Sequence, residues 1–198
     1  MSIYVLYAAV ASYLIGSIPF GFILARYAKG IDIRQFGSGN IGATNVWRTL
    51  GPVPGIIVLL LDMSKGVASV FIGRHLGGAG TELIAAFFAL CGHSWPVFIK
   101  FKGGKIVATG GGIILAISPL TTLIALIVLL ITVGISRYVS LGSIMAAITV
   151  PVTMIILRMN ILYILFGVVI AAFVIYKHRP NIKRILDGTE FKVGKGRR

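Results

Sequence analysis

The sequence predicts an all-α protein that crosses a membrane several times, as a single domain covering residues 1–198. Hydrophobic residues make up 57% of the chain and charged residues only 12%, about half the charged share of soluble domains. The apolar residues gather in runs, several of which approach the ~20 residues that a helix needs to cross a bilayer. Most Lys and Arg residues lie between these runs or in the tail.

Seven apolar runs are candidate membrane-spanning helices. They cover residues 3–28, 53–73, 82–99, 106–117, 119–136, 141–157 and 161–176. We interpret the first run as a retained helix, because a signal peptide needs basic residues before it and the first cation is Arg26. The run 106–117 would cover only roughly 18 Å, so it must tilt or be surrounded by protein. Residues 106–136 are compatible with one long helix or with two short ones that turn at Pro119.

The distribution of positive charge selects seven spans, with the N-terminus outside and the C-terminus in the cytoplasm. Lys and Arg are enriched in the cytoplasmic loops of membrane proteins. Seven spans put 16 cations in cytoplasmic segments and only Arg74 and Arg158 outside, with Lys65 inside a span. A single helix over residues 106–136 would put eight cations inside and ten outside.

The net charge of +14 indicates anionic partners. Because the cations flank apolar runs, we expect membrane lipid headgroups and phosphorylated substrates as partners, and no nucleic acid. Cys91 is the only cysteine, which excludes an intrachain disulfide. The five carboxylates are scattered along the chain, so we expect no metal site.

The first polar loop is a candidate phosphate-binding site. Three glycines within six residues let the backbone turn and bring its N–H groups close to an anion. Arg48, which follows the loop, can bind a phosphate through two parallel hydrogen bonds. The candidate residues are Gly37, Ser38, Gly39, Asn40, Gly42, Thr44, Asn45 and Arg48. The plainer alternative is a flexible connector, and the loop is not a Walker motif because no Gly-Lys-Ser/Thr follows.

A second candidate site opens the run 106–117. Gly103 and Gly104 precede the expected helix start, and Lys105 follows them. Backbone N–H groups at a helix N-terminus and the positive end of the helix dipole attract anions. Lys100 and Lys102 are more simply explained as cations that anchor the cytoplasmic end of a span.

The C-terminal segment combines polar side chains with a short amphipathic helix. Pro180 suits a first helical position, and apolar residues recur after it at helical spacing. His178, Asn181 and Arg184 recur every three residues, so they lie on adjoining faces of this helix. The basic end, residues 192–198, is expected to contact anionic lipid.

Other polar residues near the spans have plainer explanations. Ser143 lies in a short cytoplasmic cluster that is compatible with an ordinary turn. Asp62 and Lys65 stand one helical turn apart inside a span, where they can neutralise each other, so we favour a structural role. For His93, a packing role and a site role are equally supported, and His75 is interpreted as incidental.

Four segments are distinctive when they are taken together in chain order. They are residues 16–21 (Gly-Ser-Ile-Pro-Phe-Gly), the loop 37–48, residues 100–109, and the tail from His178 to Glu190. These segments resemble the acyl-phosphate-dependent glycerol-3-phosphate acyltransferases of bacterial phospholipid synthesis. Ile106 departs from the family pattern, which usually has glycine after Gly-Gly-Lys, and it stiffens the helix start.

The resemblance implies an enzyme of the bacterial plasma (inner) membrane with its active site facing the cytoplasm. It would transfer a fatty acyl group from acyl phosphate to the 1-hydroxyl of glycerol 3-phosphate, releasing lysophosphatidate and phosphate, without a cofactor or metal. Its partners would be these substrates, membrane lipids and the enzyme that supplies acyl phosphate. The implied catalytic residues are Arg48, Lys105, His178 and Asn181. The implied substrate-binding residues are Gly37, Ser38, Gly39, Asn40, Gly42, Thr44, Asn45, Gly103, Gly104, Ser143 and Arg184.

The residue types favour direct attack of the hydroxyl on the acyl phosphate, with no acyl-enzyme. The His-x4-Asp motif of acyl-CoA-dependent acyltransferases is absent, and no Ser or Cys has a recognisable His and acid partner. Arg48 and Lys105 would orient the phosphates and stabilise developing charge. Either His178 or the donor's own phosphate would accept the hydroxyl proton. A transporter of an anionic phosphorylated solute and a phospholipid-binding protein without catalysis are the alternatives.

Overall fold

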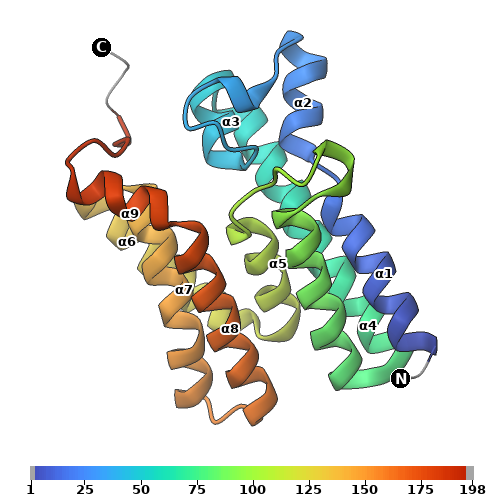
Figure 1. Ribbon diagram of the computed structural model, residues 1–198. Helices are drawn as coiled ribbons and strands as arrows, with labels where there is room; N and C mark the ends of the chain where they lie inside the picture. The colour runs from blue at the N-terminus through green and yellow to red at the C-terminus, as the bar shows by residue number, and fades with distance from the viewer. Residues whose placement is uncertain (1–2, 195–198) are drawn as a thin grey trace. The chain divides into compact units, whose positions relative to one another are not determined.

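The computed structural model describes residues 3–194 (Figure 1), and over these residues it contains helices and loops but no β-strand. The elements are α1 (Ile3–Ser17), α2 (Phe20–Lys29), η1 (Ile33–Gln35), α3 (Ala43–Leu50), α4 (Pro52–Ser94), η2 (Val97–Ile99), α5 (Val107–Ile117), α6 (Pro119–Ser136), α7 (Val139–Ile156), α8 (Ile161–Lys177) and α9 (Arg179–Leu186). Three cations of the predicted basic end, Lys195, Arg197 and Arg198, lie outside the described residues. The chain divides into two compact units, one up to Ile117 and one from Ser118 onwards.

The first apolar run forms two helices. α1 ends at Ser17 and α2 begins at Phe20, with Pro19 between them. Proline has no backbone N–H, and its ring excludes the carbonyl of the preceding turn, so it interrupts a helix that hydropathy alone would continue. By length and composition the segment Ile3–Lys29 still qualifies as one span. The predicted run 3–28 is therefore confirmed as apolar helix, with a break that the prediction did not include.

The long helix α4 reverses direction. Gly77 (φ −169°, ψ 19°) and Gly78 (φ 70°, ψ −158°) leave the helical conformation inside it. A Cβ added to Gly73 would lie 2.5 Å from the Cα of Glu82 and 2.8 Å from the Cβ of Ala85. Residues 73 and 85 would be roughly 18 Å apart in a straight helix. The arms, residues 52–76 and 79–94, are therefore antiparallel (Figure 1), and they account for two of the predicted runs.

Glycines allow the helices of the first unit to approach closely. α1 packs against the second arm of α4, where a Cβ on Gly16 would collide with the backbone of Ala89. α5 packs against the first arm, where a Cβ on Gly66 would collide with the carbonyl of Thr109. Small residues at such crossings let membrane helices associate through van der Waals packing. The α4 hairpin thus joins α1 to α5.

The short helix α5 packs against α4. It has 11 residues, close to the predicted run 106–117, and Leu115 is its only exposed residue. A helix of this length is shorter than the thickness of a bilayer core, and the burial of its residues limits their contact with lipid. Ser118 then caps α6, because its Oγ accepts a hydrogen bond from the N–H of Thr121 (3.3 Å). Of the two arrangements open for residues 106–136, the structure has two separate helices, α5 and α6, with Ser118 in an extended conformation between them.

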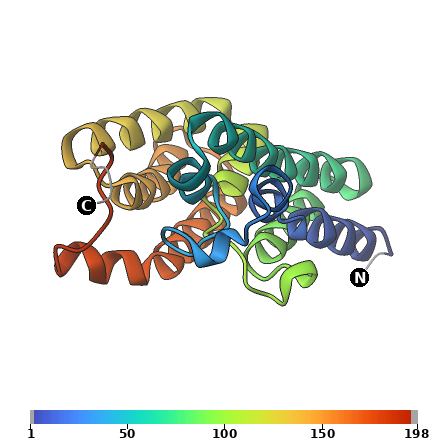
Figure 2. The same ribbon diagram turned by 90° about the horizontal axis from the view of Figure 1, so that it is seen from above.

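In the second unit, α7 lies beside both α6 and α8 (Figures 1 and 2). Arg137 turns the chain between α6 and α7 in a left-handed conformation (φ 61°), and its N–H closes α6 on the carbonyl of Val133 (2.8 Å). α9 follows α8 with a bend of 56° at His178. The predicted short helix after the last run is therefore confirmed.

Within residues 3–194, four helical segments are long and apolar enough to span a membrane, or five if α8 and α9 form one bent span. One of the four is the 48-residue segment Pro52–Ile99, which contains the reversal of α4. The protein is therefore an all-helical integral membrane protein, as the composition indicated.

Candidate functional site

The first glycine-rich loop folds around the side chain of Asn45. This side chain comes from the first turn of α3 and is 1% exposed. Its Oδ1 accepts the N–H of Ser38 (2.8 Å), and its Nδ2 donates to the carbonyls of Phe36 (2.9 Å) and Asn40 (2.8 Å). These bonds use the amide's hydrogen-bonding groups inside the loop. Asn45 was expected to donate to a ligand, and in this geometry it holds the loop.

Two further features fix the backbone of this loop. Asn40 Oδ1 accepts the N–H of Gly42 (2.8 Å), which turns the chain into α3. Gly37 (φ 58°) and Gly39 (φ 72°) adopt the left-handed conformation, which glycine reaches without steric cost. A Cβ on Gly37 would also collide with Asn45 Oδ1. The glycines are therefore required by the shape of the loop.

The exposed side of α3 carries the groups that an anion would meet. Thr44 and Arg48 are both exposed, and residues four apart lie on one helix face. α3 begins at Ala43, so its first backbone N–H groups and its positive dipole end lie at the loop. Arg48 lies in the last turn of this short helix, on the same face as Thr44 in its first turn.

Both loops of the first unit share one apolar base. Ile41 and Val46 from the first loop pack in a buried cluster with Ala25 of α2 and with Ile99, which precedes the second loop. Arg34 links the same segments, because its guanidinium donates to the carbonyl of Ile99 (3.5 Å).

The ion pair beside this base stabilises the turn that precedes the first loop. Arg34 Nη2 lies 2.7 Å from Asp32 Oδ2, and Asp32 Oδ1 also accepts the N–H of Arg34 (3.0 Å). The side-chain hydrogen bond from Arg34 lowers the pKa of the Asp32 carboxyl below its usual value. Asp32 therefore stays ionised and caps η1.

The second glycine-rich loop lies against His93. The N–H of Gly104 donates to the His93 carbonyl (2.9 Å). A Cβ on Gly103 would collide with that carbonyl, and one on Gly104 would collide with the His93 ring. Lys105 is half-buried directly after these glycines, whereas Lys100 and Lys102 are exposed. Of these three lysines, Lys105, which is next to the expected anion site, is therefore the least exposed to solvent.

Ile106 occupies a position that favours glycine. It is fully buried and has φ 62°, a conformation that is unusual for a β-branched residue. Backbone strain of this kind costs about 1–3 kcal/mol. The departure from the family pattern is therefore accommodated by burial of the Ile106 side chain.

In the second unit, Glu190 binds three polar side chains, one from α7 and two from α9. Its Oε1 accepts from Ser140 Oγ (2.9 Å) and Asn181 Nδ2 (2.7 Å), and its Oε2 accepts from Arg184 Nε (2.7 Å). Burial acts to raise the pKa of Glu190, but the hydrogen bonds from Asn181, Arg184 and Ser140 outweigh it, so that the pKa lies below its ordinary value of 4.5. Glu190 is not among the predicted site residues, although its spacing from Arg184 is visible in the sequence.

His178 and Ser143 are held by their own helices. His178 is 3% exposed, and its Nδ1 donates to the carbonyl of Val174 (2.8 Å), so the neutral ring carries its acceptor lone pair on Nε2. Ser143 Oγ donates to the carbonyl of Val139 (2.9 Å). Ser143 also lies one turn after Ser140 on α7.

Metal chemistry has no evident ligand set in the part of the chain that the structure describes. Among residues 3–194, no three His, Cys, Asp or Glu side chains group as the ligands of one ion would. The two loops of the first unit instead offer backbone N–H groups and cations, which are ligands for anions.

These features define a class: integral membrane proteins whose loops are built to bind anions. The chain belongs to the glycerol-3-phosphate acyltransferase family, whose model matches residues 6–188. It is an acyltransferase, as the resemblance of its motifs implied. A glycerol-3-phosphate acyltransferase of Desulforamulus reducens is 55% identical over 186 residues, which is 93% of each chain. One of Carboxydothermus hydrogenoformans is 45% identical over 190 residues, covering 96% of this chain and 97% of the relative.

Solved structures agree with the assignment. The crystal structure of PlsY (YgiH), an integral membrane glycerol 3-phosphate acyltransferase, in its glycerol 3-phosphate form matches with a TM-score of 0.92. Sequence identity is 40%, over 96% of both chains. The lysophosphatidic acid form of the same protein matches with a TM-score of 0.90 and 39% identity, over 96% of this chain and 95% of that one.

The lowered pKa of Glu190 predicts a specific response to acid. A carboxyl whose pKa is lower in the folded state stabilises the fold above its unfolded pKa, and this stability is lost as the pH falls through the folded pKa. The melting temperature should therefore fall below about pH 5, and this acid-dependent fall should be smaller in Glu190→Gln. The substitution itself should cost about 1–3 kcal/mol at pH 7, since it weakens hydrogen bonds to a charged group.

Thermal unfolding in detergent from pH 3 to pH 7 measures both effects, and Asp187→Asn is the matched control. Asp187 is an exposed carboxylate of the same segment, so its variant should follow the wild-type curve. Parallel curves for wild type and Glu190→Gln would contradict the assigned role of Glu190.

Proposed function

We propose that this protein transfers a fatty acyl group from acyl phosphate to the 1-hydroxyl of glycerol 3-phosphate. The observation that carries the proposal is that the first unit contains two rigid glycine-rich loops, each with a cation beside it. Both proposed substrates carry phosphate, which such loops bind. Two relatives are named glycerol-3-phosphate acyltransferase, and the similar crystal structures are described as glycerol 3-phosphate and lysophosphatidic acid forms.

The reaction needs no covalent intermediate on the protein. The hydroxyl oxygen attacks the acyl carbon, the bond from that carbon to the phosphate oxygen breaks, and lysophosphatidate and phosphate form. The hydroxyl proton passes to the departing phosphate or to His178, whose Nε2 is the acceptor of the neutral ring. Acyl phosphate is already activated, so positioning and charge stabilisation supply the catalysis.

We assign the following roles on the geometry within each unit. Arg48 and Lys105 bind phosphate groups and neutralise the developing charge, with the backbone of their loops as further donors. Asn181 and Arg184 are held by Glu190 and bind substrate, together with His178. The other proposed binding residues are Gly37, Ser38, Gly39, Asn40, Gly42, Thr44, Gly103, Gly104 and Ser143. Asn45 shapes the first loop.

We further propose seven membrane-spanning helices, with the N-terminus outside and the C-terminus in the cytoplasm. Counted separately, the two arms of α4 join α1, α5, α6, α7 and α8 to give seven apolar helices, and the charge distribution supports this orientation. The proposed location is the bacterial plasma membrane, with the substrate-binding loops facing the cytoplasm. Because the family model runs through both units, we treat residues 1–198 as one acyltransferase domain. Proposed partners are membrane lipids and the enzyme that supplies acyl phosphate.

Purified protein should make lysophosphatidate from acyl phosphate and glycerol 3-phosphate without added metal. Acyl-CoA should be a poor donor, because a thioester is less activated and its bulky carrier has no evident docking surface on these short loops. A radioactive transfer assay with each donor, with and without chelator, measures this. Efficient turnover with acyl-CoA, or loss of activity in chelator, would contradict the proposal.

Arg48 should be essential to turnover but not to folding. Arg48→Ala should lose about 2–4 kcal/mol of transition-state stabilisation, comparable with loss of an oxyanion-hole donor. Arg48→Lys should also be impaired, because an ammonium cannot form two parallel hydrogen bonds to one phosphate. Lys102→Ala removes an exposed cation from the same unit and should retain wild-type kcat/KM. Near-normal kcat/KM in Arg48→Ala would remove this residue from the proposed site.

A further inference from the structure

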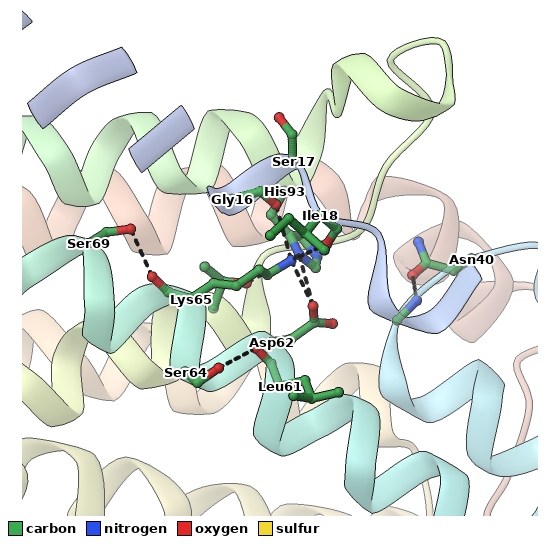
Figure 3. Close-up of polar contacts among 12 residues, drawn as sticks. Gly16, Ser17, Ile18, Asn40, Leu61, Asp62, Ser64, Lys65, Ser69 and His93 are labelled. Carbon is green, nitrogen blue, oxygen red and sulfur yellow. Dashed lines mark hydrogen bonds and ion pairs between the residues drawn. The ribbon is translucent and has the colours of Figure 1, made fainter. Parts of the chain in front are cut away.

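A buried cluster of charged and polar side chains in the first unit has no role in the reaction as described so far (Figure 3). Lys65 Nζ lies 2.7 Å from Asp62 Oδ1, and their side chains are 2% and 3% exposed. The same ammonium donates to the carbonyls of Gly16 (3.1 Å) and Ile18 (3.0 Å). It also lies 3.2 Å from His93 Nδ1. The predicted pairing of Asp62 with Lys65 is confirmed, and it extends to three further groups.

This cluster is costly to bury, which argues against incidental packing. Desolvation of a buried ion pair offsets much of its attraction, so an apolar replacement of similar volume often stabilises a protein equally well. Charged groups inside membrane-spanning segments are rare for the same reason. What an apolar replacement could not supply here is the set of bonds that Lys65 makes to other segments.

The cluster is not a catalytic triad, although it contains an acid, a histidine and a hydroxyl. In a triad the nucleophile and the acid bind opposite nitrogens of the ring. Here Thr109 Oγ1 (3.2 Å) and Asp62 Oδ1 (3.7 Å) both lie nearest to Nδ1 of His93. An ammonium group can only donate, so with Lys65 beside it Nδ1 accepts, and the ring proton of neutral His93 is on Nε2.

On one side the cluster is joined to the second loop. The His93 carbonyl accepts the N–H of Gly104 (2.9 Å), and the Gly104 backbone rests on the His93 ring. Thr109, which bonds the same ring, lies in the first turn of α5. Lys105 therefore lies between two residues that contact His93, Gly104 before it and Thr109 after it.

On the other side the cluster is joined to the support of the first loop. Gly16 and Ile18, whose carbonyls accept hydrogen bonds from Lys65, lie where α1 gives way to α2. The Ile18 carbonyl also accepts the N–H of Phe20 (3.1 Å), so the ammonium binds the turn in which the helical hydrogen bonds of α1 end. Its Nζ also lies 5.5 Å from the centre of the Phe20 ring, at the start of α2. Two residues into α2, a Cβ on Gly21 would collide with the carbonyl of Ile41 in the first loop.

We propose that Asp62, Lys65 and His93 are positioning residues that hold both glycine-rich loops of the first unit in place. The inference rests on the proposed function, because it assigns these residues to the reaction carried out at those loops. A displacement of about 1 Å in a catalytic group can cost about 100-fold in rate. The Lys65 ammonium contacts both the end of α1 and His93. It therefore fixes the loop of Arg48 and the loop of Lys105 relative to each other.

The test removes the charges together, so that neither is left buried without its partner. In Asp62→Asn/Lys65→Met, kcat/KM should fall about 100-fold. The matched control is Arg74→Met/Glu82→Gln, which removes an ion pair that joins the two arms of α4 next to their turn (2.6 Å). This control should retain wild-type kcat/KM. If the double variant does not fold, Thr109→Val and His93→Asn provide milder changes to the same cluster and should lower kcat/KM in the same direction.

A second readout follows the loops without turnover. In a Cys91→Ser background, nitroxide labels at Gln35→Cys and Lys102→Cys report on the segments beside the two loops, and one at Leu60→Cys reports on α4. All three positions are exposed. In Asp62→Asn/Lys65→Met, electron paramagnetic resonance should show more mobile labels at positions 35 and 102 and an unchanged label at position 60. The control pair should leave all three spectra unchanged.

Unchanged spectra at positions 35 and 102, or wild-type kcat/KM in the double variant, would overturn the proposal. So would an equal gain in mobility at position 60, because that result describes general loosening of the bundle. If the wild-type protein transfers no acyl group, the proposed function fails, whereas the spectra still decide whether the cluster positions the loops.

Discussion

The ammonium group of Lys65 is the contact on which the arrangement of the first unit depends. It is almost completely buried in an apolar helix, where an isolated charge would be very unfavourable. It is stable there because it meets Asp62, two carbonyls at the end of α1 and the ring of His93. Asp62 lies on the same arm of α4 as Lys65, whereas the carbonyls and His93 belong to other segments. Satisfying one buried charge therefore fixes the relative positions of α1, both arms of α4 and the start of α5.

The two glycine-rich loops are also held in shape by buried polar groups that must form hydrogen bonds. A polar side chain buried beneath a glycine-rich backbone must satisfy its hydrogen bonds within the protein, and in doing so it fixes the loop. Asn45 does this for the first loop. In the second loop the main-chain carbonyl of His93 accepts the N–H of Gly104, and the buried His93 ring bonds Thr109 at the start of α5. In the second unit, Glu190 fixes the amide of Asn181 and the guanidinium of Arg184. Groups held in this way can stabilise developing charge without first having to reorganise.

Sequence patterns predicted what depends on composition and local spacing. Hydropathy located the apolar helices, and the short run 106–117 and the helix after Pro180 were found as expected. The break at Pro19 was missed because a hydropathy window adds the residues on both sides of it. The carbonyl partners of Lys65 lie 47 and 49 residues away, so no local pattern could show them. Asn45 was predicted as a ligand donor because its type fits that role, and only the folded loop shows that its amide is used internally.

We attribute acyl transfer to anion binding and positioning, with no nucleophile on the protein. Thr109, His93 and Asp62 come closest to the arrangement of a nucleophile with its base and acid. However, Thr109 and Asp62 both approach the same ring nitrogen of His93, Nδ1, which also lies beside the Lys65 ammonium group. The most direct test is the intact mass of the purified protein after incubation with acyl phosphate and no glycerol 3-phosphate. We expect the unmodified mass at every time point, together with rapid lysophosphatidate formation once the acceptor is added. An acylated protein that forms and then decays at the rate of turnover would contradict this mechanism.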